Sequence, residues 1–393
     1  MKRRVGALTL AVAIITIVIL VIASIVGSIY GETYTREHIY GADWFCAMWA
    51  VLAIVGIGFM WVKRLQHRRV LFVFHLAFVF IALGAALTHY FGREGYIHLR
   101  EGEENNVVID NRGFLVERLP FDVTLVEFKV ENYEETNAVK DYISHIRIEG
   151  EDIDISMNNI YWSKGYRFLQ NSYDEDLRGS TLGVIYDPWG LVVTYLGYIL
   201  MMISGVVWVI SRDSFFRQVI DSKNISKRYA MPICVVVGLF VVYWIVKYVI
   251  GWSEGSLPPV LMSPLLFIHI VIIMSAYGLL AVFFIFGVIG LIKIDKQKEM
   301  MRYGKALLYP AVILLAIGIF VGAIWASISW GSYWNWDPKE VWALITLLVY
   351  LYPIHYKIDE AKRFHAFAII AFLTVLITYF GVNYLLGGLH SYA

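Results

Sequence analysis

The residues best suited to chemistry lie between Trp330 and Trp342, where the chain reads W-G-S-Y-W-N-W-D-P-K-E-V-W. Five tryptophans fall within eighteen residues, at Trp325, Trp330, Trp334, Trp336 and Trp342. The aromatic belt of a membrane protein needs only one or two such rings at a helix end. Because the surplus places many flat π-surfaces together, we expect residues 330–342, the tryptophan loop, to form a platform for a flat ligand.

The end of the tryptophan loop also carries a helix-start signal. Asp337-Pro338-Lys339-Glu340 places an N-cap residue before a proline at the first helical position and an acid at the third. We interpret Asp337 and Glu340 mainly as helix starters, which fix where the loop ends and thereby aim Trp334 and Trp336. Lys339 is the only basic residue of the loop, and it is a candidate partner for a propionate if the flat ligand is a porphyrin.

Composition indicates which elements position these residues. The chain has 393 residues, of which 59% are apolar and 17% charged, and its mean hydropathy is +0.63. Such a chain is a polytopic membrane protein rather than a soluble one. We expect about nine transmembrane helices from the apolar runs long enough to cross a bilayer. These runs are residues 5–30, 44–62, 70–91, 190–211, 229–250, 264–292, 305–329, 340–356 and 364–387.

The connectors between these runs alternate in basic content, which predicts the orientation. Lys and Arg residues cluster before the first run and then after every second run, and such loops are cytoplasmic. The N-terminus is therefore expected inside and the C-terminus outside. A cleaved signal sequence over residues 1–30 is the alternative, although the run exceeds the usual apolar region of about 7–15 residues. Cys46 and Cys234 lie isolated in apolar segments, so they predict neither a disulfide nor a metal cluster.

Residues 92–189 interrupt the membrane pattern after the third predicted helix. They contain many acids, turn clusters, and alternating apolar and polar residues at 121–130 and 142–148. This pattern predicts a small β-rich extracytoplasmic domain. His98 and His145 fall within it without ligand-like spacing, and we interpret them as ordinary strand or surface histidines.

Four histidines fall at the predicted membrane faces. His75 and His355 lie near the cytoplasmic ends of their helices, whereas His269 and His390 lie near the outer face with the tryptophan loop. A spanning helix is about 30 Å long, but two nitrogens bound to opposite sides of one metal are only about 4 Å apart. The four histidines therefore cannot share one iron. They could form two bis-histidine sites, as iron porphyrin ligation requires.

Each histidine also has a simpler interpretation. A histidine in hydrocarbon, such as His75, is costly and usually functional, but an interhelical hydrogen bond could satisfy it. His355, His269 and His390 lie at polar boundaries, where a histidine costs little. We expect no ligand role for the other histidines near the membrane faces, which are His67, His89 and His365.

The tryptophan loop resembles the "WWD" signature of cytochrome c-type biogenesis proteins. G-V-N-Y-L-L-G-G-L-H-S-Y at 381–392 is similar to the C-terminal end of that family. The segments F-I-H-I-V-I-I-M-S-A-Y around His269 and L-Y-P-I-H before Tyr356 resemble its two other histidine segments. V-F-H-L-A-F-V-F around His75, followed by an outer β domain, is similar to the ResB/CcsB partner. The chain thus resembles a fused CcsB-CcsA cytochrome c synthase of System II.

The resemblance implies a division of the chain. Residues 1–91 would be CcsB/ResB-like helices, 92–189 the outer domain, 190–259 two further helices, and 260–393 the CcsA-like haem-handling region. The outer domain, of about a hundred residues, and the helix count are both smaller than we expect for the fused family. The implied location is the bacterial cytoplasmic membrane, with the active site on the outer, periplasmic face.

The resemblance also implies a reaction, that of a holocytochrome c synthase (haem lyase). Haem b would enter at His75 and His355, move outward, and be presented at the tryptophan loop between the catalytic ligands His269 and His390. There its vinyl groups would be joined to the cysteines of a CXXCH motif in apocytochrome c. The expected partners are that apocytochrome, an extracytoplasmic thioredoxin-like thiol reductant and membrane lipid, with no nucleic acid.

Other functions could use the same histidines. A transmembrane b-type cytochrome that carries electrons also needs histidine pairs at both faces, but it does not account for the tryptophan loop. A haem exporter without synthase activity is a second alternative. A proton-coupled transporter is less favoured, because no Asp or Glu lies in the middle of a spanning run.

Overall fold

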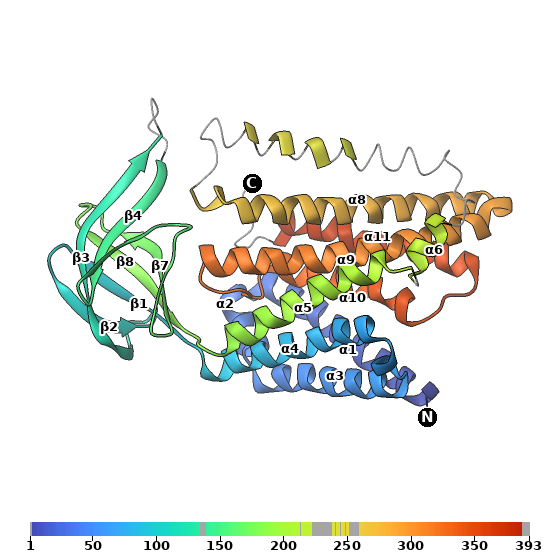
Figure 1. Ribbon diagram of the computed structural model, residues 1–393, viewed down its shortest axis with the longest axis horizontal. Coiled ribbons are helices and arrows are strands. Elements are labelled where there is room, and N and C mark those ends of the chain that lie inside the picture. Colours follow the sequence, from blue (N-terminus) through green and yellow to red (C-terminus); the bar gives the residue numbers. More distant parts are fainter. Residues whose placement is uncertain are drawn as a thin grey trace.

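The computed structural model has a body of long helices with a β domain at one end (Figure 1). It describes residues 2–133, 139–212, 214–221, 238–239, 241–243, 245–247, 249–250 and 259–386. The α-helices are α1 (Lys2–Tyr30), α2 (Glu32–Thr35), α3 (Asp43–Val62), α4 (Arg69–Phe91), α5 (Gly190–Ile210), α6 (Phe215–Asp221), α8 (Pro264–Ile292), α9 (Gln297–Ser329), α10 (Pro338–His355) and α11 (Ala361–Leu376). Short helices connect them: η1 (Arg36–Tyr40), η2 (Leu65–His67), η3 (Pro259–Leu261), η4 (Ile294–Lys296) and η5 (Ile377–Leu386).

The described residues contain seven helices long and apolar enough to cross a membrane. They are Val5–Tyr30, Asp43–Val62, Arg69–Phe91, Gly190–Val219, Pro264–Ile292, Ile294–Ser329 and Ala361–Leu386. The predicted count of about nine is not confirmed. The predicted span 229–250 falls largely outside the described residues, and the predicted span 340–356 corresponds to α10, which is helical but not among the seven.

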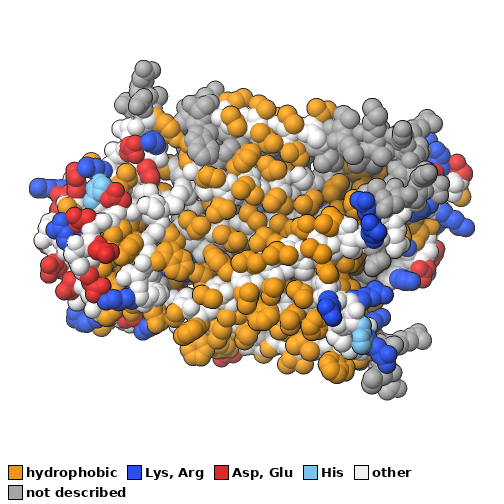
Figure 2. Space-filling model, viewed as in Figure 1, with side chains coloured by type: hydrophobic (Ala, Val, Ile, Leu, Met, Phe, Trp, Pro, Cys, Tyr) orange, Lys and Arg blue, Asp and Glu red, His pale blue; other side chains and the backbone are white. Residues whose placement is uncertain are grey.

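The surface agrees with a multi-pass membrane protein. A broad apolar band covers the helical body, with Lys and Arg side chains gathered at the end away from the β domain (Figure 2). Many large apolar side chains on the helices are exposed; Trp61, for example, is 74% exposed and Ile54 67%. Exposed apolar side chains at such density are unfavourable in water but suit a lipid environment.

Small residues let the helices approach closely. A Cβ on Gly84 of α4 would lie 2.2 Å from Oγ1 of Thr194 on α5. A Cβ on Gly197 of α5 would likewise lie 2.9 Å from the carbonyl oxygen of Ala77 on α4. In lipid, where the hydrophobic effect does not drive helices together, such close packing supplies much of the association. The pair α4 and α5 therefore forms a fixed support from which the β domain extends.

The β domain lies between α4 and α5, as the sequence predicts. It is one antiparallel sheet of eight strands in the order β5-β4-β3-β2-β1-β8-β7-β6. The strands are β1 (Arg93–Arg100), β2 (Glu104–Ile109), β3 (Leu115–Asn132), β4 (Val139–Ile148), β5 (Glu151–Ile155), β6 (Tyr161–Ser163), β7 (Tyr166–Tyr173) and β8 (Gly179–Tyr186). The alternation along β3 puts Phe121, Val123 and Leu125 into the domain core.

Helix α1 runs beside α10. At the end away from the β domain, the Tyr356 hydroxyl donates to the carbonyl oxygen of Gly6 at 2.6 Å. At the β-domain end, Nε1 of Trp342 donates to Oγ of Ser24 at 2.8 Å. These two hydrogen bonds fix α10 along its length against α1.

Candidate functional site

Two of the four predicted ligand histidines lie together. His75 is on the second turn of α4, and His355 is the last residue of α10. Their ring centroids are 5.8 Å apart, with ring planes at 80°. Two imidazoles on opposite sides of one metal, at about 2 Å per metal–nitrogen bond, have centroids roughly 6 Å apart. The centroid separation of the pair is therefore compatible with a shared iron.

The backbone sets the tautomer of both rings. Nδ1 of His75 donates to the carbonyl oxygen of Leu71 at 2.8 Å, and Nδ1 of His355 donates to that of Leu351 at 2.9 Å. A neutral imidazole that donates from Nδ1 carries its lone pair on Nε2, which is a metal-binding nitrogen. The Phe59 ring of α3 lies beside His355, at 6.3 Å between centroids. This inner pair thus has ligand chemistry and an aromatic neighbour.

Of the two predicted outer histidines, the structure describes only His269. His269 lies in the second turn of α8, where its Nδ1 donates to the carbonyl oxygen of Gly318 on α9 at 2.8 Å. A Cβ on Gly322 would lie 2.6 Å from the His269 ring, so this glycine makes room for the imidazole. His390 lies outside the described residues. An outer pair of His269 and His390 stays a prediction.

The five tryptophans have different packing partners. Trp325 and Trp330 contact each other edge to face at 4.7 Å and pack with Leu261 and Leu266. Trp342 is 8% exposed and packs against α1. Only Trp334 and Trp336 lie together within the loop, at 5.7 Å and 85°. Trp325 and Trp342 therefore take part in helix packing, and a platform formed by the loop stays a prediction.

Trp336 has the most constrained position in the loop. Its φ of 58° lies in the left-handed region, which bulky residues rarely adopt. Its indole stacks on the Tyr40 ring at 4.8 Å and 8° between planes. Phe45 of α3 contacts it at 4.9 Å and 80°. Tyr40 and Phe45 were missed from the sequence, because aromatic residues at the end of an apolar run are also typical of a membrane interface.

The predicted helix start at Asp337 is confirmed. The Asp337 carboxylate accepts from the backbone N–H of Lys339 at 2.9 Å, and Pro338 is the first residue of α10. Oε2 of Glu340 accepts from the backbone N–H groups of Asn335 and Asp337 at 2.9 and 3.3 Å. This capping box holds the backbone on both sides of Trp336.

Lys339 reaches the segment that leads to His390. Its ammonium donates to Oδ1 of Asn383 on η5 at 2.9 Å. The C-terminal segment therefore starts beside the tryptophan loop, seven residues before His390. A role for Lys339 as a propionate partner stays a prediction.

The β domain packs directly on the start of the tryptophan loop. Oγ of Ser329 donates to Oδ1 of Asn158 at 2.9 Å. The buried guanidinium of Arg167 on β7 donates to Oγ of Ser327 at 2.8 Å, and burial lowers the pKa of Arg167. A Cβ on Gly331 would lie 2.4 Å from Cδ1 of Ile185 on β8. These contacts make the β domain part of the wall around the loop.

A chain of hydroxyl groups links the same loop to the α4–α5 support. The Tyr333 hydroxyl donates to Oγ1 of Thr88 at 2.9 Å, and Thr88 donates to Oδ2 of Asp187 at 2.6 Å. The other oxygen of Asp187 accepts from the backbone N–H of Gly190 at 2.9 Å, at the start of α5. Tyr333 is thereby held at a fixed depth.

The remaining histidines lie outside both candidate pairs. His98 and His145 donate hydrogen bonds to the carboxylates of Asp174 and Asp154, as expected for strand histidines. His38, His67 and His89 are exposed. His365 is fully buried rather than part of a basic surface, and its Nε2 donates to the carbonyl oxygen of Gln297 at 3.0 Å.

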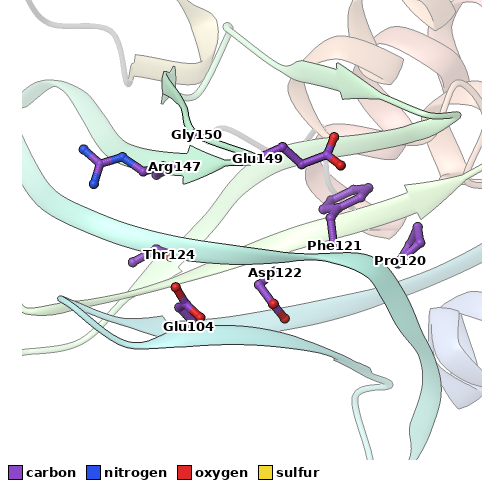
Figure 3. A pocket seen from close by; sticks show the side chains of 8 residues that line it. All are labelled: Glu104, Pro120, Phe121, Asp122, Thr124, Arg147, Glu149 and Gly150. Carbon is purple, nitrogen blue, oxygen red and sulfur yellow. The ribbon is translucent and has the colours of Figure 1, made fainter.

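The β domain has a hollow whose lining includes none of the four predicted ligand histidines (Figure 3). Its volume is about 360 Å³, and its lining is Glu104, Pro120, Phe121, Asp122, Thr124, Arg147, Glu149 and Gly150. Two of its four ionic side chains, Arg147 and Glu149, are paired with Asp152 and Lys164. Within the described residues, no cluster of three or more His, Cys, Asp or Glu side chains could hold a metal ion.

Two family models match this chain over adjoining ranges. The model described as "Cytochrome C assembly protein" matches residues 191–390, and the "ResB-like family" model matches residues 63–187. The inner pair combines His75 from the second range with His355 from the first.

Curated relatives match shorter parts. Protein NrfI of Wolinella succinogenes is 37% identical over 153 residues, which are 35% of this chain and 17% of NrfI. Cytochrome c biogenesis protein CcsA of Porphyra purpurea is 54% identical over 82 residues, which are 20% of this chain and 26% of that protein. CcsA of Chlamydomonas reinhardtii is 36% identical over 154 residues, 36% of this chain and 44% of that protein. The chain thus spans less than half the length of each of these relatives.

Proposed function

Because the chain belongs to the cytochrome c assembly protein family and joins that family's region to a ResB-like region, we propose that it acts in cytochrome c biogenesis as a fused CcsB-CcsA synthase. It carries haem b across the membrane and attaches the haem vinyl groups to CXXCH cysteines of apocytochrome c. The substrates are the haem and the apocytochrome, and a thioredoxin-like protein on the outer side keeps the cysteines reduced.

The observation that carries the proposal is the inner histidine pair. His75 and His355 come from the two family-matched regions, yet their rings are 5.8 Å apart. Both rings have the tautomer that leaves Nε2 as the ligand nitrogen. A fused chain that brings one ligand from each part supports a haem site built by both parts together.

The attachment of haem to the apocytochrome takes place at the β-domain end of the helices, opposite to the inner histidine pair. His269 and His390 bind the haem iron beside the tryptophan loop, and Trp330, Trp334 and Trp336 limit how the porphyrin can turn. Asp337 caps α10 at the end of the loop, and Trp342 holds α10 against α1. Each attachment forms one carbon–sulfur bond and moves the thiol hydrogen to the neighbouring vinyl carbon, so it needs no electron acceptor. The cysteines must arrive as thiols. Positioning of this kind can lower a barrier by up to about 7–11 kcal/mol.

We also propose a division of the chain into regions and an orientation in the membrane. In this proposal residues 1–91 are the CcsB/ResB-like part, 92–189 the extracytoplasmic domain, 190–259 the part assigned to the fourth and fifth transmembrane helices, and 260–393 the CcsA-like haem-handling region. The N-terminus lies in the cytoplasm of a bacterium, because the basic connectors lie at the end of the helices away from the β domain.

Co-expression tests the function directly. The chain is produced with a CXXCH apocytochrome in a bacterium without its own maturation system, and the denatured cytochrome is stained for haem. Covalent haem is expected with the unmodified chain and with the control His89→Ala, an exposed histidine at the outer end of α4. It should be lost with His269→Ala or His390→Ala.

Other outcomes separate the alternatives. Haem that copurifies with the protein without any stained cytochrome would reject the synthase step and favour a haem exporter or a b-type electron carrier. The electron carrier would in addition show rapid reduction of bound haem by a donor on one face and oxidation by an acceptor on the other. His75→Ala and His355→Ala should each lower the copurified haem, and imidazole in the medium should restore part of it.

A further inference from the structure

We infer that Tyr40 is a positioning residue for the chemistry at the tryptophan loop. It covers one face of the Trp336 indole and, with Phe45, holds that indole in one orientation. We call Tyr40, Phe45 and Trp336 the aromatic clamp. The inference rests on the proposed function, and it assigns a role to Tyr40 and Phe45, which neither family model matches, since those matches begin at residue 63.

The backbone of Trp336 cannot rotate freely. Its φ of 58° is a conformation that L-residues with bulky side chains rarely adopt. The carboxylate of Glu340 accepts from the N–H groups of Asn335 and Asp337, the neighbours on either side. A tryptophan held in the left-handed region between two such bonds aims its side chain in a direction that ordinary loop geometry would not give.

The Trp336 indole packs against two buried aromatic side chains, Tyr40 and Phe45. Tyr40 is 6% exposed and Phe45 1%, and both lie in the cluster that packs α1 and α3 against α10. The Tyr40 and Trp336 rings are nearly parallel, with planes at 8° and centroids 4.8 Å apart. Offset stacking of this kind is favourable and directional. A flat ligand therefore cannot occupy the face of Trp336 that Tyr40 covers, which limits the ways in which a porphyrin can contact the indole.

The element that carries Tyr40 also contacts the β domain. Tyr40 is the last residue of η1, a π-helical segment, and such segments often mark functional positions. Glu37 of the same segment forms an ion pair with Arg112 at 2.9 Å. Arg112 lies in the turn between β2 and β3. The connector formed by α2 and η1 thus contacts the outer domain through Glu37 and the tryptophan loop through Tyr40.

The test is the Tyr40→Leu variant in the co-expression system, compared with Tyr40→Phe. Leu removes the stacked ring, whereas Phe keeps it. The yield of covalent haem, normalised to the amount of membrane protein, should fall on the order of tenfold to a hundredfold with Leu and stay near the unmodified level with Phe. Because a loosely held porphyrin presents its vinyl groups unevenly, the share of cytochrome with only one thioether bond, seen in the pyridine haemochrome spectrum, should rise with Leu.

Tyr34→Leu is the matched control. Tyr34 stacks on His38 at 4.3 Å on the same connector, and both are exposed. This variant loses a stacked pair without touching the tryptophan loop and should keep both yield and product ratio. A merely structural role for Tyr40 predicts a lower yield with an unchanged ratio of single to double attachment, and that result would overturn the inference.

A second set of variants tests the clamp if Tyr40→Leu does not fold. If Tyr40→Leu is not recovered from the membrane, thermal unfolding of Phe45→Leu, Trp336→Leu and the double variant measures whether the two rings are coupled. Additive shifts would overturn the clamp, and a smaller shift in the double variant than the sum would support it. If the unmodified chain yields no covalent haem, the proposed function fails and these coupling data alone decide on the clamp.

Discussion

Gly331→Ala tests whether the outer domain truly sits against the tryptophan loop. Gly331 has φ +83°, and a Cβ there would lie 2.4 Å from Cδ1 of Ile185 and 3.0 Å from Cδ1 of Leu169. Those side chains belong to β8 and β7, so the added methyl group would press directly on the β domain. Glycine is thus required at this position for two separate reasons.

The two costs can be added. A left-handed backbone costs an alanine about 1–2 kcal/mol, and overpacking by one methyl group costs about 1–3 kcal/mol. Both contacted atoms are side-chain ends, which can move, so the second cost should fall in the lower half of its range. We expect the free energy of unfolding to fall by about 2–4 kcal/mol.

Gly113→Ala separates the two costs. Gly113 has φ +82°, and a Cβ there would meet nothing within 4 Å. It therefore carries the same backbone strain without the contact. Thermal unfolding of the purified proteins in one detergent should place Gly113→Ala between the unmodified chain and Gly331→Ala. Haem attachment should fall for Gly331→Ala alone, because only that variant displaces the loop.

Equal unfolding temperatures and equal haem attachment for the two glycine variants would refute this reasoning. In that case the β domain does not pack on the loop as the structure has it.

Ser24→Ala removes the acceptor of the buried Trp342 N–H and should destabilise the protein by about 1–3 kcal/mol; Ser28→Ala, an exposed residue one turn further along α1, should change its melting temperature little. Equal shifts for the two variants would contradict the contact between α1 and α10. The hydrogen bond from Arg100 holds the pKa of Asp174 below its usual value, so this carboxylate stabilises the fold above pH ~4 and the contribution is lost as the pH falls through its lowered pKa. Asp174→Asn should therefore lower outer-domain stability at pH 7 by about 0.2–1 kcal/mol, and melts at pH 7 and pH 3 should show the difference shrinking in acid.

Much of the architecture could be predicted, because membrane insertion depends on local composition. Hydropathy located the long helices, and the loss of that pattern after Phe91 located the β domain. The capping box at Asp337 and Glu340 was also predictable, since its residues lie three apart. The sequence predicted only that His75 and His355 lie at a similar depth in the membrane. It could not predict that they are neighbours, because two helices with residues at equal depth need not be adjacent.

The environment of the tryptophan loop could not be predicted in the same way. Tyr40 and Trp336 are about 300 residues apart in the chain, and no local period connects them. Counting tryptophans suggested one platform, but Trp325 and Trp342 are buried in helix packing. A tryptophan in the sequence has the same appearance whether its ring faces a ligand or another helix. Only the packing partners distinguish the two uses.

The contacts of the loop differ in kind from those of the inner histidines. His75 and His355 are held by backbone carbonyl groups of their own helices, one turn earlier. The loop instead depends on distant parts: Tyr40 against Trp336, and Ile185 against Gly331. Variants at the loop contacts should therefore reduce haem attachment while leaving the inner haem content unchanged. In the proposed function, haem binding at the inner pair and haem presentation at the loop would then be mechanically separate.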